Sequence, residues 1–327
     1  MSAPSDAELR AGLEQALAGV GLELAGEIER RPSPYRTSFP IEELRFELAG
    51  RGPVRVGFKQ LGWDRLDPAA QLAKPRFLHD PEREPAVYRA LLPQAPAGPP
   101  EFFGSALDGD RGWLFVEWVE GRELFQVGER KLWEEAARWL ARFHVALVPE
   151  RERLRREARL LDHDAAFHRR WIERAREFAA DPKQVEWLAP RHEQVVEALL
   201  AQPRTVLHGE FYASNVLVAS DFDPTPVGRR SEARIAPVDW ELAATGTGLS
   251  DLAALVSGWP DEERAAIAAA YAAEPGVPAF DPRDLDLARL AVAVQWLGWA
   301  PPEWEPPQGQ RHDWLGEALA LAEELEL

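Results

Sequence analysis

A chain of 327 residues with 46% apolar and 28% charged residues is long enough to bury more than one hydrophobic core and is too apolar to be disordered throughout. The absence of cysteine excludes disulfides, thiolate catalysis and cysteine-ligated metals, and it favours a reducing compartment such as the cytoplasm. The formal net charge of −17 argues against binding to nucleic acid or to anionic membranes and favours a cationic ligand, although most of the 55 carboxylates are expected to form a solvated surface.

The chain begins with a pattern typical of an amphipathic helix. Ser5 and Glu8 have the spacing of a capping box, and apolar residues follow at helical intervals, which predicts a helix over residues 6–18. The same segment lacks the basic-then-apolar order of a signal peptide, and no apolar run reaches the roughly 20 residues that span a bilayer. We therefore expect a cytoplasmic protein without a membrane segment.

The next part of the chain predicts a small sheet with one helix. Residues 42–48 and 54–59 have strand character, and the turn at residues 50–53 joins them as a hairpin. Helical character follows over residues 82–92, and residues 112–119 have the composition of a mostly buried strand.

From residue 131 onward the pattern is mainly helical. Apolar residues recur at helical spacing over residues 131–147, 150–178, 184–200, 261–273 and 314–325. The exception is a pair of short apolar runs at residues 215–219 and 233–238, which flank a polar loop and predict a β-hairpin. The expected architecture is a small sheet followed by a larger helical part.

Polar residues that could bind a metal or take part in catalysis lie at the ends of this second hairpin. His208 and Glu210 come shortly before its first strand, and Asp239 follows its second strand. Antiparallel pairing would bring Asn215 and Asp239 to the same end of the ribbon, where an amide oxygen and a carboxylate suit Mg²⁺ that also binds nucleotide phosphates. The Glu210 carboxylate could orient an incoming hydroxyl and accept its proton, so the pattern predicts phosphoryl transfer.

Two motifs in this region resemble those of the aminoglycoside phosphotransferase and choline kinase superfamily. The family loop H-G-D-x-x-x-x-N matches residues 208–215 except that Glu210 replaces the aspartate. The family sequence D-W-E, followed by G-x-x-x-x-D-L-A, matches residues 239–241 and 246–253. The resemblance extends over about residues 33–319.

The resemblance implies an α+β, two-lobed protein-kinase-like fold. A small antiparallel β-sheet N-lobe would occupy residues 1–115, an interlobe linker residues 116–122, and a mainly α-helical C-lobe residues 123–327. The implied activity is transfer of a phosphoryl group from ATP or GTP, with Mg²⁺, to a hydroxyl of a small molecule such as an aminoglycoside, sugar, choline, amino-alcohol or macrolide. The sequence does not choose among these acceptors.

The resemblance also assigns roles to residues of the N-terminal part. Lys59 would hold the α- and β-phosphates, with Glu84 as its ion-pair partner and Glu82 as the alternative if the helix register shifts at Pro85.

Two further nucleotide contacts follow from position alone. Arg36 and Ser38 lie where the family places its phosphate-covering loop, although residues 33–38 are not glycine-rich. Glu117 and Val119 lie in the linker, where backbone groups would hydrogen-bond the base.

The replacement of the family's catalytic aspartate by Glu210 leaves two hypotheses. The longer carboxylate could act as the general base of an active enzyme, which the presence of Lys59, Asn215 and Asp239 favours. The alternative is a nucleotide-binding pseudokinase that has lost transfer. No A-P-E-like segment follows Asp239, which disfavours a protein substrate.

Other polar and aromatic residues are expected to be structural. Asp251 would brace the catalytic loop, His208 would orient it through hydrogen bonds, and His144 would be packed. Four residues have a spacing that fits no established metal site: Asp162, His163, Asp164 and His168. Core packing is expected for at least half of the 13 tryptophans, and stacking on a sugar or a cation is the alternative. Four of them gather where the family closes its acceptor pocket: Trp296, Trp299, Trp304 and Trp314.

Overall fold

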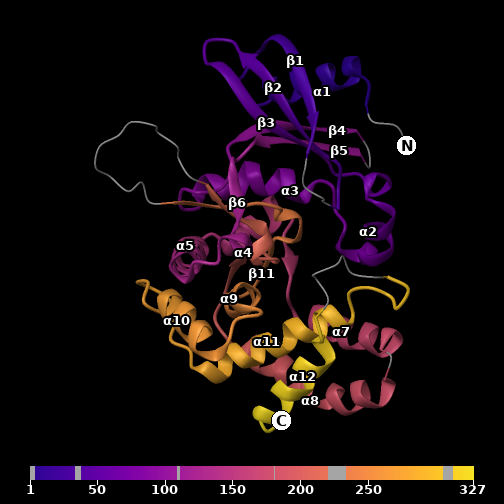
Figure 1. Ribbon diagram of the computed structural model, residues 1–327, viewed down its shortest axis with the longest axis vertical. Helices are drawn as coiled ribbons and strands as arrows, with labels where there is room; N and C mark the ends of the chain where they lie inside the picture. The colour runs from indigo at the N-terminus through magenta and orange to yellow at the C-terminus, as the bar shows by residue number, and fades with distance from the viewer. Residues whose placement is uncertain (1–3, 34–37, 109–110, 180, 220–232, 305–311) are drawn as a thin grey trace.

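The chain folds into a part built on a sheet and a mainly helical part, which lie at opposite ends of the molecule (Figure 1). The computed structural model describes residues 4–33, 38–108, 111–179, 181–219, 233–304 and 312–327. The sheet has five antiparallel strands in the order β1-β2-β3-β5-β4. The α+β fold class predicted from the sequence is confirmed.

The predicted N-terminal hairpin is confirmed within this sheet, whose strands are β1 (Leu24–Pro32), β2 (Ile41–Leu48), β3 (Gly52–Gln60), β4 (Phe102–Asp108) and β5 (Arg111–Glu117). Ile41 pairs with Lys59 and Leu48 with Gly52, so the register of β2 and β3 follows the predicted turn. Strands β1 and β4 were not predicted. β1 has no buried residue, so its sequence carries no clear alternation of apolar and polar side chains.

The predicted first helix is α1 (Asp6–Ala18), which packs against the sheet. Ser5 caps it, and Ser5 and Glu8 form the expected capping box. A separate hydrophobic core joins the helix to the strands and includes Leu9, Leu13, Leu17, Leu44, Phe58 and Phe115. Gly104 of β4 has a φ of 120°, and a Cβ there would lie 2.2 Å from the carbonyl oxygen of Ala16, so the helix approaches β4 more closely than a side chain permits.

The connection from β3 into the helical part contains short helices. Helix α2 (Pro68–Ala73) precedes α3 (Arg83–Ala86), which continues as a π-helical turn over Val87–Leu91. The predicted helix over residues 82–92 is therefore helical but irregular. Pro93 lacks the N–H that would continue a regular ladder, and the helical segment ends in a 3₁₀ turn over Leu92–Gln94.

The helical character predicted over residues 150–178 is confirmed at both ends of the stretch but is interrupted between them. The structure has α6 (Arg151–Glu157), the short strand β7 (Leu161–Asp162) and α7 (Ala165–Phe178). The helix breaks because Arg159 adopts a left-handed φ of 55°, and a new helix begins at Asp164, whose carboxylate accepts the Phe167 N–H at 2.8 Å.

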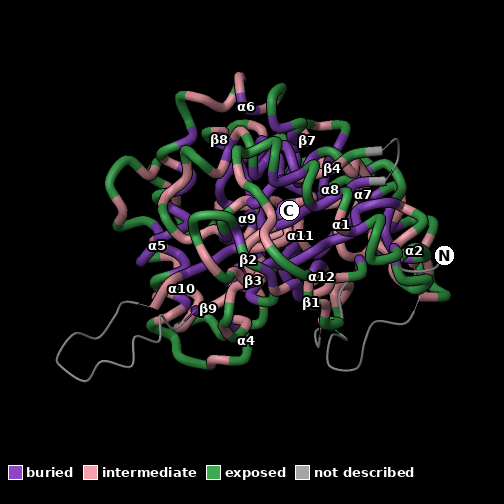
Figure 2. The backbone as a smooth tube through the Cα atoms, turned by 90° about the horizontal axis from the view of Figure 1, so that it is seen from above, coloured by how far each residue is buried: buried purple, intermediate pink, exposed green. Residues whose placement is uncertain are grey.

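The other helices described are α4 (Leu124–Val127), α5 (Arg130–Leu147), α8 (Pro182–Ala201), α9 (Leu249–Val256), α10 (Asp261–Ala272), α11 (Pro282–Leu297) and α12 (Trp314–Glu324). Helix α11 packs against α7, α8, α9 and α12, and Figure 2 shows buried segments filling this centre. A helix enclosed on several sides needs no polar face, which explains why its amphipathic pattern was not visible in the sequence. None of the helices in these described segments has the length and apolar character that a membrane crossing requires.

Two three-stranded sheets in the helical part position the polar loops. β9 (Val216–Ala219) lies between β6 (Gly121–Glu123) and β10 (Arg234–Pro237), and β11 (Ala244–Thr247) lies between β7 and β8 (Arg204–Leu207). β9 and β10 form the predicted antiparallel hairpin. The loops after β8 and β10 therefore meet at one edge of these sheets.

Candidate active site

The loop between β8 and β9 has a shape that depends on Gly209. Its φ is 90°, and a Cβ there would lie 2.0 Å from the carbonyl oxygen of Leu242, so only glycine fits. The Glu210 carbonyl accepts the Tyr212 N–H at 2.7 Å and the Asn215 Nδ2 at 3.0 Å. These two bonds close the loop into a turn that fixes the Glu210 backbone.

The buried carboxylate of Asp251, on α9, braces this loop from below. It accepts the backbone N–H groups of His208 at 2.7 Å and of Gly209 at 3.0 Å. It also lies 3.2 Å from Nε2 of His144, whose Nδ1 lies 2.8 Å from the Tyr271 hydroxyl. Burial opposes ionisation of Asp251, but the hydrogen bonds from His144 and His208 lower its pKa overall, so the carboxylate stays charged.

The imidazole of His208 is fully buried and is bonded on both sides. Nδ1 accepts the Glu210 N–H at 3.3 Å, and Nε2 donates to the Val238 carbonyl at 3.0 Å. Burial lowers its pKa, which keeps the ring neutral. The ring thus joins the loop after β8 to the end of β10, an arrangement that suits orientation of the loop.

Asn215 and Asp239 lie at the same end of the β9–β10 ribbon. The Val238 N–H donates to the Asn215 carbonyl at 2.9 Å, and Asp239 follows directly with a left-handed φ of 65°. The Asn215 Nδ2 is held by the Glu210 carbonyl, and its Oδ1 accepts no hydrogen bond from any described residue. An amide oxygen and a carboxylate are hard donors that fit Mg²⁺.

No group of three or more His, Asp or Glu side chains in the described segments is arranged to hold a metal by itself. A cation beside Asn215 and Asp239 would therefore need further oxygen atoms, which nucleotide phosphates and water supply. The donor set fits Mg²⁺ held together with a nucleotide.

A buried lysine connects the sheet to this ribbon. Nζ of Lys59, on β3, lies 2.7 Å from Oε2 of Glu84 on α3 and 2.6 Å from Oδ1 of Asp239. The side chains of Lys59 and Glu84 are 9% and 3% exposed, whereas that of Asp239 is 35% exposed and still faces solvent. The other Glu84 oxygen accepts the Trp240 N–H at 3.2 Å. Glu82, the alternative partner, instead lies beside Arg159.

The charges in this cluster are strongly coupled. Burial alone would lower the pKa of Lys59, but Asp239 and Glu84 raise it well above its usual range, so the ammonium remains charged. Burial raises the pKa of Glu84 to about 7 against the opposing effect of Lys59. Asp239 resists the same burial because Lys59 lowers its pKa.

Glu210 is half-buried and its acidity differs from that of an ordinary glutamate. Burial, with smaller contributions from Glu241 and Asp239, raises its pKa to about 8, although Lys74 and Lys59 oppose the shift. Only the ionised form can accept the proton of a hydroxyl, and with this pKa that form increases as the pH rises through about 8.

The two predicted linker residues, Glu117 and Val119, differ in their hydrogen bonding. The Glu117 N–H donates to the Glu101 carbonyl at 2.8 Å, and its carboxylate accepts two bonds from Arg234 at 2.6 and 2.7 Å. The Trp118 N–H is bonded to a carbonyl of β3. Val119 takes part in no backbone hydrogen bond within the described chain, so its N–H and C=O can meet a ligand.

The predicted phosphate-covering loop is described only at its ends. Arg36 lies outside the described residues. Ser38 is exposed, and its carbonyl accepts the Asp67 N–H at 3.0 Å. The next residue, Phe39, is buried with its ring 5.5 Å from Nζ of Lys59, so the end of the loop lies at the lysine.

Aromatic side chains cluster around Tyr212, which lies two residues after Glu210. The Tyr212 hydroxyl accepts Nε1 of Trp296 at 2.8 Å, and the Trp296 ring stacks on Trp314 with centroids 5.5 Å apart. Trp299 lies 5.6 Å from Trp296 and stacks on Trp171. Trp296, Trp299 and Trp314 are only half-buried, so they are not simply core residues.

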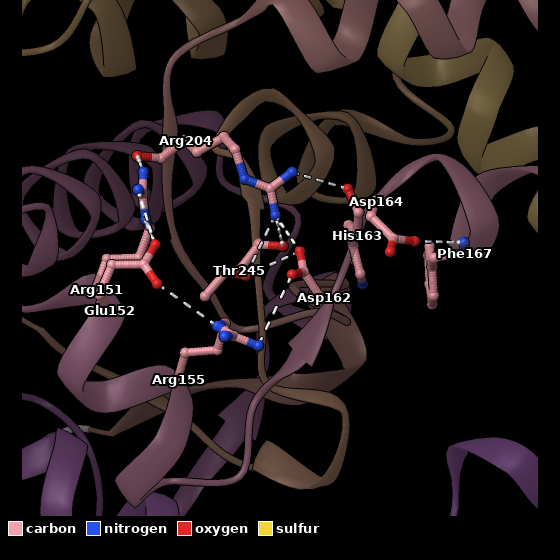
Figure 3. A network of polar contacts seen from close by, with 9 residues as sticks. All are labelled: Arg151, Glu152, Arg155, Asp162, His163, Asp164, Phe167, Arg204 and Thr245. Carbon is pink, nitrogen blue, oxygen red and sulfur yellow. Dashed lines mark hydrogen bonds and ion pairs between the residues drawn. The ribbon is translucent and has the colours of Figure 1, made fainter.

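The residues around Asp162 have structural partners (Figure 3). The Asp162 carboxylate binds Arg204, and Asp164 caps α7. His163 and His168 are buried with ring centroids 5.9 Å apart, and burial lowers their pKa values to about 3 and about 4. This cluster holds the start of α7 against β8.

The structure adds two charged residues that the sequence analysis missed. Lys74 contacts the carboxylate of Glu241, and Arg234 binds Glu117 across the junction of the two parts. Glu241 belongs to the D-W-E motif, but Lys74 and Arg234 stand in no motif. Only the fold brings them to the site.

Lys59 on a small antiparallel sheet contacts Asp239 at the end of a hairpin in the helical part, near the loop that carries Glu210. This arrangement is that of a kinase-like phosphotransferase fold. The model of the phosphotransferase enzyme family matches residues 69–289, more than half of the chain, so the protein belongs to this family. Lys59 lies outside the matched range. No curated protein matches the chain.

Several solved structures share the fold at low sequence identity. The GDP complex of aminoglycoside 2'-phosphotransferase-IIIa is 13% identical over 99% of both chains, with a TM-score of 0.57. A microcompartment-associated aminopropanol kinase is 15% identical over 94% of this chain and 93% of its own, with a TM-score of 0.59. Macrolide 2'-phosphotransferase MphH from Brachybacterium faecium is 17% identical over 95% and 97%, with a TM-score of 0.55.

Proposed function

We propose that the protein transfers the γ-phosphoryl group of ATP or GTP, with Mg²⁺, to a hydroxyl of a small molecule. The observation that carries this proposal is the convergence of Lys59, Asp239 and Asn215 beside the Glu210 loop. A cation, two hard oxygen donors and a carboxylate are the groups that phosphoryl transfer needs.

Each residue has a role in this reaction. Lys59, oriented by Glu84, would bind the nucleotide phosphates. Asn215 and Asp239 would hold Mg²⁺, which when bound neutralises phosphate charge. Glu210 accepts the proton of the acceptor hydroxyl while that oxygen bonds to the γ-phosphorus. The bond from this phosphorus to the bridging oxygen breaks, and the nucleoside diphosphate leaves with its electron pair.

The nucleotide would lie between the two parts of the chain. We assign residues 1–115 to an N-lobe, 116–122 to the linker and 123–327 to a C-lobe. The open backbone groups of Val119 support a base-binding role for the linker, whereas the carboxylate of Glu117 is committed to Arg234. Arg36 and Ser38 would cover the phosphates.

The acceptor is proposed to carry an amino group as well as a hydroxyl. The net charge of −17 and the half-buried tryptophans near Tyr212 favour a cation or a sugar ring. Structures of similar fold include enzymes named for aminoglycosides, macrolides and aminopropanol. The absence of cysteine suits a cytoplasmic reaction.

The proposal is tested by nucleotide-dependent thermal stabilisation. ATP, GTP and ADP are each added with and without Mg²⁺ to the wild type, to Asp239→Asn and to the matched control Asp261→Asn, whose side chain is 95% exposed on α10. Binding to the folded state raises the melting temperature. We expect a Mg²⁺-dependent rise that Asp239→Asn abolishes and the control retains. No rise with any nucleotide in the wild type would overturn the proposal.

The second candidate, a nucleotide-binding pseudokinase, is motivated by Glu210 in place of aspartate. It predicts nucleotide-dependent stabilisation without transfer to any acceptor in a panel of hydroxylated amines and sugars. Transfer by the wild type would exclude it.

A further inference from the structure

A second lysine enters the site from helix α2. Asp67 caps this helix by accepting the Ala69 N–H at 2.9 Å, and Pro68 occupies its first position. Pro75 stops the helix, because the residue before a proline is driven to an extended conformation, and Lys74 has a ψ of 123°. The local sequence therefore fixes the point at which the Lys74 side chain leaves the helix.

The Lys74 and Lys59 ammonium groups both lie beside the Phe39 ring. Its side chain is only 6% exposed and its Nζ contacts the Glu241 carboxylate. Nζ of Lys74 lies 5.1 Å from the Phe39 ring centroid, and Nζ of Lys59 lies 5.5 Å from the same centroid. Each lysine binds a carboxylate of the segment after β10: Lys74 binds Glu241 and Lys59 binds Asp239.

Structural support of this segment does not require Lys74. The Glu241 carbonyl already accepts Nη1 of Arg83 at 2.7 Å, and the Trp240 N–H is held by Glu84. When a lysine and a glutamate are buried together, the loss of their hydration offsets much of their mutual attraction. Such a pair therefore stabilises a fold less than apolar side chains do. A buried cation beside a phosphate-binding lysine is better explained by a ligand of high negative charge.

We propose that Lys74 is a second phosphate-binding lysine, which exchanges Glu241 for the terminal phosphoryl group when a nucleoside triphosphate binds. This inference rests on the proposed function. Lys59 would hold the inner phosphates, and Lys74 would stabilise the charge on the group that is transferred. Lys74 also lowers the pKa of Glu210, so its charge is felt where the acceptor hydroxyl meets the phosphate.

The test compares nucleotides that differ in the terminal phosphate. Calorimetry with ADP and with a non-hydrolysable ATP analogue, both with Mg²⁺, gives dissociation constants for the wild type, Lys74→Met and Lys59→Met. The loss of a charged hydrogen bond is expected to weaken binding of the triphosphate roughly 10- to 100-fold in Lys74→Met and to leave ADP binding within about threefold. Lys59→Met should weaken both nucleotides.

A double variant distinguishes the effect of losing the Lys74 ammonium from the effect of leaving the Glu241 carboxylate unpaired. Lys74→Met leaves Glu241 without its ammonium, and that carboxylate could itself repel the phosphate. Lys74→Met/Glu241→Gln removes both charges: a triphosphate deficit that persists supports a direct contact, whereas recovery to wild-type affinity overturns it.

The remaining outcomes are also decisive. Wild-type affinity for both nucleotides in Lys74→Met refutes the inference and leaves the proposed function intact. A wild type that binds neither nucleotide defeats the proposed function and the inference with it. Equal weakening of ADP and triphosphate in Lys74→Met refutes a specific contact with the terminal phosphate.

Discussion

Nζ of Lys59 lies 2.6 Å from Oδ1 of Asp239, although 180 residues separate them in the chain. This contact joins β3 of the sheet to the loop after β10 of the helical part, and Glu84 on α3 holds the other side of the same ammonium at 2.7 Å. One buried cation thus connects the two parts at the centre of the site.

Removal of this cation should destabilise the fold. Lys59→Met leaves Glu84 buried without its charged partner, so we expect the free energy of unfolding to fall by about 3–5 kcal/mol, measured by urea denaturation. The double variant Lys59→Met/Glu84→Gln removes the buried charge and keeps an oxygen for the Trp240 N–H. It should regain at least half of the loss, and a double variant no more stable than the single one would contradict this account.

Gly209→Ala should displace the loop that carries Glu210. A Cβ would lie 2.0 Å from the Leu242 carbonyl oxygen, so the backbone must move and Glu210 with it. We expect transfer to slow by about 100-fold or more, since small displacements of catalytic groups have effects of that order. Gly128→Ala is the control, because Gly128 has a φ of 68° with no atom within 4 Å of the added Cβ. It should cost only about 1–2 kcal/mol in stability and leave kcat unchanged.

Glu210→Asp tests whether the longer carboxylate is the working base. An active enzyme adapted to glutamate should lose roughly 10- to 100-fold in kcat, because the shorter side chain no longer reaches the hydroxyl. Glu210→Gln should lose more. The rate is followed as ADP release with an acceptor panel, or with water as the acceptor. A gain of activity in Glu210→Asp would instead indicate a decayed site.

His192→Leu should reduce the sensitivity of the fold to acid. Burial lowers the pKa of His192 to about 3, and its Nδ1 has no hydrogen-bond partner among the described residues. An unfolded histidine has a pKa near 6.5, so below that pH the unfolded state binds a proton that the folded state refuses, and the stability contributed by the neutral ring is lost as the pH falls toward 3.

The wild type and His192→Leu are compared by urea denaturation between pH 7.5 and pH 5. The difference in their free energies of unfolding should shift in favour of the variant by up to about 1.4 kcal/mol for each pH unit below roughly 6. A difference that does not change with pH would show that His192 titrates normally in the folded protein.

The parts of the site that could be predicted from the sequence are those that depend on residues close together in the chain. The hairpin pattern around Asn215 and Asp239 was visible because apolar runs alternate with polar turns, and the structure brings their backbones together as expected. The choice between Glu84 and Glu82 was left open, because residues two apart on a helix face different ways and only the sheet decides which one meets Lys59.

The remainder depends on packing between distant segments. Nothing near Lys74 in the sequence distinguishes it from a surface lysine, and its burial follows from where α2 ends. Helix α11 was missed because its surroundings are apolar on several sides, and the break at Arg159 was missed because helical periodicity continues across it. These features are set by tertiary contacts, which leave little trace in local sequence.

The brace beneath the loop that carries Glu210 extends well beyond the site. Asp251 binds the loop backbone on one side and His144 on the other, and His144 in turn meets Tyr271 of α10. The position of Glu210 thus depends on a chain of buried polar contacts that starts at Tyr271 on α10, a helix that contributes no residue to the site. Natural variation at Tyr271 would therefore act on turnover from a distance, and a catalytic defect in this protein need not map to its cleft.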